Sequence, residues 1–309
     1  MNQSLPPVIQ ALDDIADARV LCDLVALDPG DPGWRNRNVH LNLMGSVLGG
    51  QLAAHCLVAA LDGAADRFLP SALHILFASA PTMDHAWRLE CEHLRDGRRF
   101  AHRLVRLTQQ TKLLAHASAI LQARGGSGEK MIEYSPPRPE VPGPESLASR
   151  AELRSAAGKD AAATAMVAGH EFMDIRPVPD EVAERLQGHG TQSAYWLRMP
   201  LARGLDPVTQ MALLTLASDF WYSLPLQSIG RKLGVKETPL TTSLDHCMWF
   251  HAPVDCSEWL LFQAAGTVVS GGVGMKRAMI WQADGRLVAN VEQRALATLA
   301  APGLKMPSS

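Results

Sequence analysis

The sequence has little of what marks membrane, secreted or nucleic-acid-binding proteins. No stretch of its 309 residues approaches the apolar length of a membrane-spanning helix, which needs roughly 18 residues. Residues 1–14 lack the basic and apolar segments of a secretory signal. A net charge of −2 provides no basic field for nucleic acid. We therefore expect neither a membrane nor a nucleic acid among the partners.

Cysteine is also scarce, and its spacing fits neither disulfides nor a metal site. The five cysteines are odd in number and scattered, and they form no Cys-x-x-Cys pair. We therefore expect reduced thiols in a cytoplasmic protein that has no metal centre. What the chain does contain is 47% apolar and 19% charged residues, which is ordinary for a globular protein with a full core. Its length predicts about two domains.

Two apolar segments of good helix-forming composition lie in corresponding places of the two halves. Residues 52–61 follow the run Gly49-Gly50-Gln51, and residues 210–220 form the second segment. Ala and Leu recur on all sides of both segments, which is typical of buried helices. We expect two buried central helices, the first of which has its N-terminal N–H groups at the glycines.

Alternation of apolar and polar residues predicts antiparallel strands around these helices. The predicted strands are residues 18–27 (an opening strand), 73–122 (three or four strands), 171–198 (one strand region), 241–253, 259–265, 274–281 and 287–299. Asp284-Gly285 is a typical hairpin turn between the last two. Each helix is thus expected to have a set of antiparallel strands after it.

A proline-rich segment separates the two halves. Residues 126–163 begin rich in glycine, contain five prolines between positions 136 and 144, and end rich in alanine. Proline-dense polar sequence cannot pair as a central strand, so we predict a surface linker with a short helix over residues 145–157. This division gives an N-terminal domain of residues 1–125 and a C-terminal domain of residues 164–309.

The residue types His, Pro and Trp recur at the same spacing in the two halves. The interval from His to Pro is seven residues in both, and the interval from Pro to Trp is six in both. The residues are His74, Pro81 and Trp87 in the first half and His246, Pro253 and Trp259 in the second, with Phe77 and Phe250 between the His and the Pro at intervals that differ by one residue. The repeat predicts a helix wrapped by a curved sheet, built twice in tandem. Two such sheets could pair edge to edge and so hide exposed strand edges.

Short motifs in both halves carry a resemblance to a known family. The most specific is the run Asp-His-Cys-Met-Trp-Phe-His at residues 245–251. The others are Gly49-Gly50-Gln51, Leu94-Arg95-Asp96-Gly97, Leu216-Ala217-Ser218-Asp219, Glu258-Trp259-Leu260-Leu261 and Asp284-Gly285 with Leu287-Val288-Ala289. The chain resembles the acyl-CoA thioesterase II family over roughly residues 25–125 and 195–300. The resemblance implies an α+β tandem double hotdog, each half a long central helix wrapped by a curved antiparallel sheet.

The resemblance also implies an activity and its residues. The activity is hydrolysis of acyl-CoA thioesters to free carboxylic acid and CoA, with acyl-CoA as the substrate and no metal or cofactor. The implied residues hold a water: Asp219 as its general base or anchor, with Ser243 and Gln293 orienting it. Such a set makes physical sense, because a buried carboxylate is costly unless polar groups meet it. A double hotdog resembles a fused dimer that often pairs again, so we expect a homo-oligomer.

A helix N-terminus should complete this site. Its backbone N–H groups would face the thioester carbonyl as negative charge develops there. Either residues 49–51 or residues 208–210 could supply it. Each member of the trio also has a purely structural alternative: Asp219 as a solvated helix end, Ser243 as a hydroxyl bonded to backbone, and Gln293 as a residue of the wet sheet face.

The more conspicuous neighbours are predicted to be structural. Cys247 and His246 are adjacent in a strand, so they point to opposite faces and cannot form a thiol–imidazole pair. His246 has a counterpart in His74, which favours a hydrogen-bonded core histidine. Asp245 is expected to bond to its neighbours. The three large side chains that follow, Met248, Trp249 and Phe250, are expected to fill the core or line an acyl cavity.

The chain departs from the family pattern close to the trio. The departures are Ala252, Arg294-Ala295 and the glycine-rich residues 270–274. They leave two alternatives to hydrolysis. One is an acyl-CoA-binding protein without turnover. The other is a hotdog enoyl-CoA hydratase or dehydratase, which would need an Asp-His pair, whereas Asp245 and His246 should face opposite ways.

Overall fold

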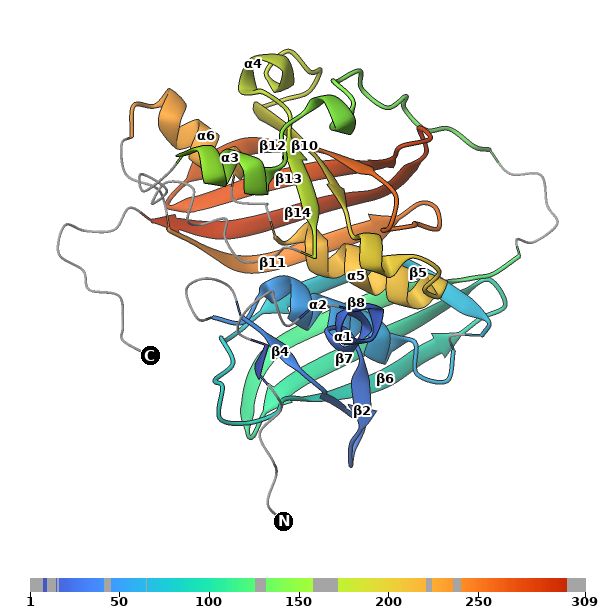
Figure 1. Ribbon diagram of the computed structural model, residues 1–309. Helices are drawn as coiled ribbons and strands as arrows, with labels where there is room; N and C mark the ends of the chain where they lie inside the picture. Colours follow the sequence, from blue (N-terminus) through green and yellow to red (C-terminus); the bar gives the residue numbers. More distant parts are fainter. Residues whose placement is uncertain are drawn as a thin grey trace.

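One large curved sheet dominates the structure. A computed structural model describes residues 8–9, 15, 17–41, 46–64, 66–125, 132–157, 172–220, 224–235 and 240–298. Twelve strands form the sheet, and every neighbouring pair in it is antiparallel. Figure 1 shows the first half of the chain below and the second above. Among the described residues, no helix has the length and apolar character that crossing a membrane requires.

Each half contains a twelve-residue helix followed later in the chain by four long antiparallel strands. The first half has β1 (Val8–Ile9), α1 (Ala18–Asp23), β2 (Leu27–Pro29), β3 (Trp34–Asn36), β4 (Val39–His40), α2 (Gly49–Ala60), β5 (Phe68–Phe77), β6 (Arg88–Asp96), β7 (Phe100–Gln109) and β8 (Lys112–Ala123). The linker has η2 (Pro144–Ser146) and α3 (Arg150–Ala157). The second half has β9 (Asp174–Pro177), α4 (Asp180–Ala183), β10 (Thr191–Arg198), η5 (Pro200–Ala202), α5 (Pro207–Ser218), α6 (Leu224–Lys232), β11 (Leu240–Phe250), β12 (Leu260–Ser270), β13 (Val273–Gln282) and β14 (Leu287–Thr298).

The strand order is a mirror image about the pair β5–β11. Outward from this pair, the first half contributes β5, β8, β7, β6, β3 and β2, and the second contributes β11, β14, β13, β12, β10 and β9. The predicted duplication and the edge-to-edge pairing of the two sheets are therefore confirmed. The strand edges that would meet solvent in a separate half are paired with each other here.

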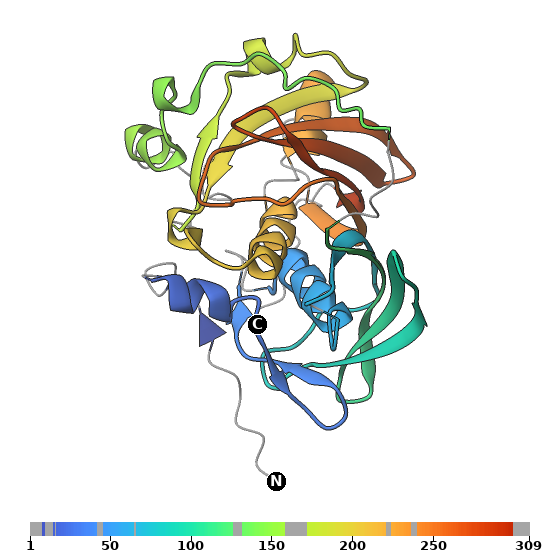
Figure 2. The same cartoon turned by 90° about the vertical axis from the view of Figure 1, so that its right-hand side faces the viewer.

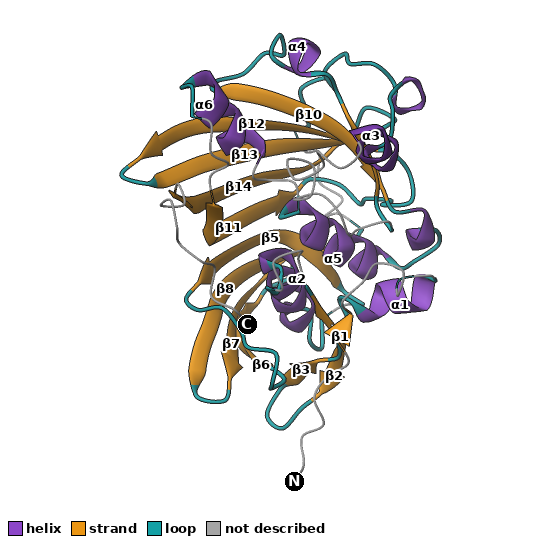
Figure 3. Ribbon diagram, turned by 60° about the vertical axis from the view of Figure 1, so that its left-hand side comes forward, coloured by secondary structure: helices purple, strands orange, loops and turns teal. Residues whose placement is uncertain are grey.

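The two predicted central helices are confirmed, and they lie together inside the curve of the sheet. Figures 2 and 3 show the strands curving around α2 and α5, which pack against each other. Ten of the twelve residues of α2 and nine of the twelve residues of α5 are buried. The helix α5 begins at Pro207 because the Asp206 side chain accepts the N–H groups of Val208 and Thr209.

The predicted opening strand over residues 18–27 is wrong. Residues 18–23 form α1, and β2 begins only at Leu27. The reason is the residue before the apolar run: the Asp17 side chain accepts the N–H of Val20 and caps a helix. The predicted single strand region over residues 171–198 contains two strands, β9 and β10, with the helix α4 between them, and residue 171 lies outside the described residues.

The repeated spacing of His and Trp is not the signature of the duplication. Across β5–β11, His74 pairs with Cys247 rather than His246, and His74 is exposed whereas His246 is buried. Trp87 lies in the main core, whereas Trp259 belongs to a separate cluster with Trp196. A shift of one residue reverses the face of a strand, so equal spacing in sequence does not ensure equal position. The inference about His246 from His74 is therefore wrong.

The described part of the linker, residues 132–157, packs against the outer side of the second half. Trp196 Nε1 donates to the carbonyl oxygen of Pro142 at 2.9 Å. Trp259 Nε1 donates to Glu145 Oε1 at 3.1 Å. The short helix predicted over residues 145–157 is present as two pieces, η2 and α3. The linker thus covers apolar surface that the sheet would otherwise expose.

Candidate active site

Asp219, Ser243 and Gln293 meet in the structure. Gln293 Nε2 donates to Asp219 Oδ1 at 2.6 Å and to Ser243 Oγ at 2.9 Å. Ser243 Oγ donates to Asp219 Oδ1 at 3.5 Å. The three side chains come from α5, β11 and β14, so the fold gathers a carboxylate, a hydroxyl and an amide into one hydrogen-bonded group.

A β-bulge directs Ser243 into this group. Along β11, strict alternation would place Ser243 on the face opposite to His246. The pairing with β14 shifts between Ser243 and Asp245, so that Ser243 stands opposite Ala295 while Asp245 stands opposite Arg294. The extra residue returns Ser243 to the inner face, where Ala295 is fully buried.

Asp219 lies where the two central helices meet. It is the C-cap residue of α5, and its Oδ2 accepts the backbone N–H of Gly50 at 2.8 Å. A Cβ on Gly50 would lie 2.4 Å from the carbonyl oxygen of Leu216, so only glycine allows the helices to come this close. The positive end of the α2 macrodipole thus faces the Asp219 carboxylate.

The amide of Gln293 has a defined orientation. Its Nε2 donates to both Asp219 and Ser243, so the other amide atom, Oε1, points elsewhere. Gln293 is 1% exposed, and among the described residues its Oε1 has no hydrogen-bond partner. A buried acceptor of this kind is normally satisfied by a water or a ligand. Gln293 therefore does not lie on the wet sheet face.

The corresponding place in the first half is filled with hydrocarbon. Leu61 is the C-cap of α2 as Asp219 is of α5, and Val208 is the second residue of α5 as Gly50 is of α2. Leu61 clusters with Phe68 and Leu121, and Val208 packs against this cluster. The duplicated fold therefore has one polar site and one apolar counterpart.

Only one of the two expected helix N-termini lies beside the trio. The N–H groups of residues 208–210 are taken by the side chain and carbonyl oxygen of Asp206. Residues 49–51 lie at the trio, where a Cβ on Gly49 would be 2.9 Å from Asp219 Oδ2. The expectation that residues 208–210 could serve the site is therefore wrong.

His246 is buried beside the trio and bonds to the helix. Its Nε2 lies 2.9 Å from Ser218 Oγ, and Ser218 Oγ donates to the carbonyl oxygen of Thr215 at 2.8 Å. Since the single hydroxyl proton goes to Thr215, His246 Nε2 is the donor to Ser218. Burial lowers the pKa of His246, which favours the neutral imidazole. The prediction of a hydrogen-bonded core histidine is confirmed on this contact.

The other conspicuous residues of β11 take no part in the trio. Cys247 and His246 face opposite sides as predicted, and burial raises the pKa of the Cys247 thiol. Asp245 bonds to Arg294, whose backbone N–H and Nε each donate at 2.7 Å. Met248 and Phe250 lie in the core. Trp249 is half-buried on the opposite face, where its ring meets that of the exposed His74 edge-on at 5.1 Å.

The departures from the family pattern leave the trio intact. Arg294 points away from Gln293 and pairs with Asp245 on the other face. Gly271 and Gly272 have positive φ angles in the turn between β12 and β13, which glycine adopts without strain. Ala252 packs at the edge of the main core.

Lys276 is a residue near the site that sequence reasoning missed. It stands opposite Gln293 in the pairing of β13 with β14 and is 2% exposed. The alternation of β13 places Lys276 on the buried face with Gly274 and Ala278, and this pattern could have identified it from the sequence. A lysine at an inward position of a strand is rare enough to be noticed.

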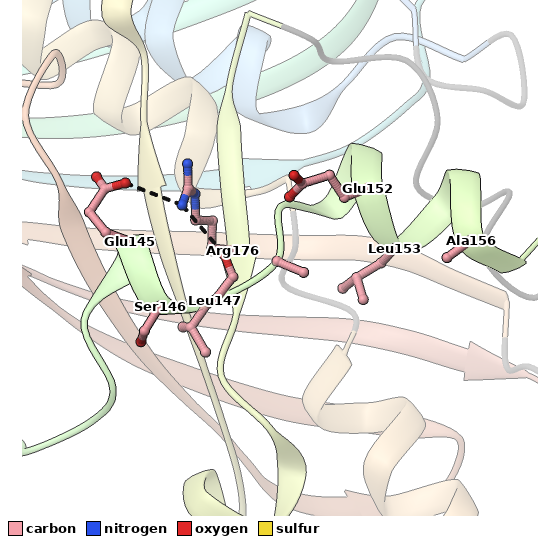
Figure 4. Close-up of a pocket in the computed structure, with 8 residues that line it drawn as sticks. Glu145, Ser146, Leu147, Glu152, Leu153, Ala156 and Arg176 are labelled. Carbon is pink, nitrogen blue, oxygen red and sulfur yellow. Dashed lines mark hydrogen bonds and ion pairs between the residues drawn. The ribbon is translucent and has the colours of Figure 1, made fainter.

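No metal centre is evident in the part of the chain that the structure describes, since no group of three or more His, Cys, Asp or Glu side chains there could hold an ion. A cavity of about 500 Å³ lies elsewhere, between the linker and β9 (Figure 4). It is lined by Glu145, Glu152, Arg176 and apolar linker side chains, with Arg176 paired to Glu145 at 3.4 Å. The residues that line this cavity come from the linker and β9, whereas the trio comes from α5, β11 and β14.

Comparison with known proteins bears on both halves. The family model described as acyl-CoA thioesterase C-terminal domain matches residues 139–297, and the N-terminal domain model matches residues 39–122. Acyl-CoA thioesterase 2 of Haemophilus influenzae is 26% identical over 257 residues, which is 81% of this chain and 87% of that protein. Acyl-coenzyme A thioesterase 8 of Mus musculus is 26% identical over 297 residues, 91% and 89% of the two chains.

Solved structures support the fold. Acyl-CoA thioesterase II TesB2 from Mycobacterium marinum is 24% identical, with a TM-score of 0.74 over 91% of this chain and 99% of that one. A hot dog fold protein from Alicyclobacillus acidocaldarius is 20% identical, with a TM-score of 0.67 and the same coverage. The expected α+β double hotdog is therefore confirmed. By its match to both domain models, this chain belongs to the acyl-CoA thioesterase family.

Proposed function

We propose that this protein hydrolyses acyl-CoA thioesters to free carboxylic acid and CoA, by direct attack of a water held by Asp219, Ser243 and Gln293. The observation that carries the proposal is the closed hydrogen-bonded trio at the junction of α2 and α5, in a chain of the acyl-CoA thioesterase family.

The roles follow from donors and acceptors. In the proposed complex, the water donates one hydrogen bond to the Asp219 carboxylate and the other to Gln293 Oε1, the buried acceptor that has no described partner. Ser243 accepts from Gln293 and donates to Asp219, so it fixes both groups at the angle the water needs. A positioned base of this kind contributes about 10²- to 10⁴-fold to the rate.

The proposed steps balance as follows. The water oxygen attacks the carbonyl carbon while Asp219 takes its proton, and the carbonyl oxygen becomes an oxyanion. Collapse of this intermediate breaks the C–S bond, and the thiolate of CoA takes the proton from Asp219. The N-terminal turn of α2 is the candidate for stabilising the oxyanion. Its Gly50 N–H donates to Asp219 and its Gln51 N–H to the carbonyl oxygen of Leu48, so the Gly49 N–H, beside Asp219, is the proposed donor.

A covalent nucleophile fits the neighbourhood less well. Ser218 gives its proton to the carbonyl oxygen of Thr215. Cys247 points to the opposite face of the sheet from His246. An activated serine or cysteine needs a base that accepts its proton. His246 Nε2 donates to Ser218 Oγ, so it does not accept the proton of Ser218. The Asp-His pair of a hydratase is not formed, because Asp245 is held on the outer side by Arg294.

We also propose the cellular setting and assembly expected from the sequence. All five cysteines are free, which supports a reducing, cytoplasmic compartment. Exposed apolar side chains such as Leu76 and Ile120, at 59% and 37%, support association into a homo-oligomer. We propose residues 1–125 and 164–309 as the duplicated units and residues 126–163 as the linker.

The function is tested by release of free thiol from short, medium and long saturated acyl-CoAs by the purified protein. Hydrolysis predicts one thiol and one carboxylic acid for each acyl-CoA consumed. Tight calorimetric binding of acyl-CoA without thiol release would instead show a binding protein. Loss of enoyl absorbance from an enoyl-CoA, with the thioester retained, would show a hydratase. Either result would overturn the proposal.

A further inference from the structure

Lys276 is a buried cation one strand away from the trio. It pairs with Gln293 on β14 and with Gly266 on β12, while Gln293 pairs with His246 on β11. Directly opposite residues of antiparallel strands have side chains about 5 Å apart on the same face. Lys276, Gln293 and His246 therefore stand in one row on the face of the sheet that carries the helices, with 2%, 1% and 1% of their surfaces exposed.

The helix α6 closes the sheet around Lys276. A Cβ on Gly266, across from Lys276, would lie 2.7 Å from the carbonyl oxygen of Pro225. A Cβ on Gly274, two residues before Lys276, would lie 2.6 Å from Leu226 Cδ2. The two glycines thus let α6 reach the sheet on both sides of the lysine. No helix stands between α2 and β5 in the described part of the first half, so α6 is particular to the half with the polar site.

The first half holds a second buried cation in the same place of its sheet. Arg103 is the fourth residue of β7 as Lys276 is of β13, and both are 2% exposed. Arg103 Nη2 donates to Asp96 Oδ1 at 2.6 Å. Asp96 is the last residue of β6, whereas the last residue of β12 is Ser270. The described hairpin between β12 and β13 therefore carries no carboxylate at the position of Asp96.

Asp219 is a described carboxylate whose charge acts on Lys276. Burial lowers the pKa of Lys276 to about 8, and the charge of Asp219 opposes that decrease. The other described titratable group in the row is His246, whose pKa is lowered by burial first and by Lys276 in addition, against the charges of Asp219 and Asp245. The described part of α6 faces this region with Pro225, Leu226 and Ile229, which carry no charge.

We propose that Lys276 is a positioning residue of the hydrolysis, whose buried ammonium stabilises the Asp219 carboxylate against protonation when the bound acyl chain excludes water from the site. This inference rests on the proposed function. Removing water from around a carboxylate favours its neutral form, and a nearby cation opposes that effect. A neutral Asp219 cannot take the proton of the attacking water, so Lys276 would set the lower pH limit of activity.

The test is the pH profile of kcat/KM in Lys276→Met and Lys276→Arg, with the thermal midpoint as a check on folding. We expect the midpoint of the acidic limb to move up by about one pH unit or more in Lys276→Met and to return toward the wild-type pH in Lys276→Arg. Lys276→Gln is a second neutral variant, for use if Lys276→Met does not fold. Lys232→Met, an exposed lysine of α6 with 51% of its side chain accessible, is the matched control and should leave the limb in place.

Two results separate this inference from the proposed function. An acidic limb unchanged in both neutral variants, with wild-type activity on its plateau, would overturn the role of Lys276 and leave the trio untouched. Retention of both activity and the acidic limb in Asp219→Asn would instead overturn the assignment of Asp219 as the base. A merely structural lysine would change the thermal midpoint but not the pH of the limb.

Discussion

At the scale of single residues, the site depends on the β-bulge in β11, which no residue type in the sequence indicates. Ser243 faces the inner side of the sheet only because the pairing of β11 with β14 shifts beside it. The family resemblance selected Ser243 from its place before Asp245-His246, whereas alternation alone would have turned it outward. The motif therefore predicted the residue, and the bulge that makes it useful could be seen only in the structure.

His55 gives a prediction for stability at the residue scale. It is fully buried in α2, donates from Nε2 to the carbonyl oxygen of Leu24, and accepts from Trp87 Nε1 at Nδ1. Burial lowers the pKa of His55 to about 4, against about 6.5 in an unfolded chain. Between these values the unfolded state binds more protons, so stability falls as the pH falls.

We expect the titration of His55 to remove about 3 kcal/mol from the free energy of unfolding between pH 7 and pH 4, because the pKa of His55 is about 4 in the folded chain and about 6.5 in the unfolded chain. Denaturant unfolding at a series of pH values measures this. The slope should be reduced in His55→Gln and retained in His189→Gln, an exposed histidine. Equal slopes in both variants would show that His55 is not the group that titrates.

At the scale of elements, the contact between α2 and α5 distinguishes the two halves. Gly50 lets Asp219 reach the backbone of α2, while the corresponding pair, Val208 and Leu61, fills its place with apolar atoms. The sequence predicted both helices from composition, but it could not show that they run close enough for only glycine to fit. The apolar run over residues 18–27 suggested a strand, whereas the Asp17 cap turns its first part into the helix α1.

Substitution of Gly50 by alanine tests this contact. Helix propensity alone predicts that alanine stabilises α2 by up to about 1 kcal/mol. The Cβ would lie 2.9 Å from the Cβ of Asp219 and closer still to the Leu216 carbonyl oxygen, so we expect a loss of about 1–3 kcal/mol and at least a tenfold lower kcat. Thermal unfolding and the thiol assay measure both quantities.

The matched control is Gly143→Ala, since Gly143 has a φ of −64° and nothing within 4 Å of the added Cβ. It should unfold and react as the wild type does. A Gly50→Ala variant that is stabilised and fully active would mean that the helices are free to separate without cost to the site.

At the scale of the whole molecule, duplication produced one continuous sheet, but of the two corresponding helix junctions that the structure describes only one is polar. The order of strands and the pairing of β5 with β11 follow from the tandem repeat that the sequence indicated. The residue-by-residue correspondence of the two halves was wrong, because His74 is exposed and His246 faces the core. A sequence repeat reports the succession of elements reliably, whereas the face of each residue depends on register and bulges that spacing does not reveal.

The central claim is that all hydrolysis occurs at the one site built on Asp219, and the kcat for acyl-CoA hydrolysis by Asp219→Asn tests it most directly. Asp245→Asn is the control, since it makes the same chemical change on the outer side of β11. The account predicts at least a hundredfold lower kcat in Asp219→Asn and near wild-type turnover in Asp245→Asn. A wild-type rate in Asp219→Asn, or half of it from a working counterpart site, would contradict the account.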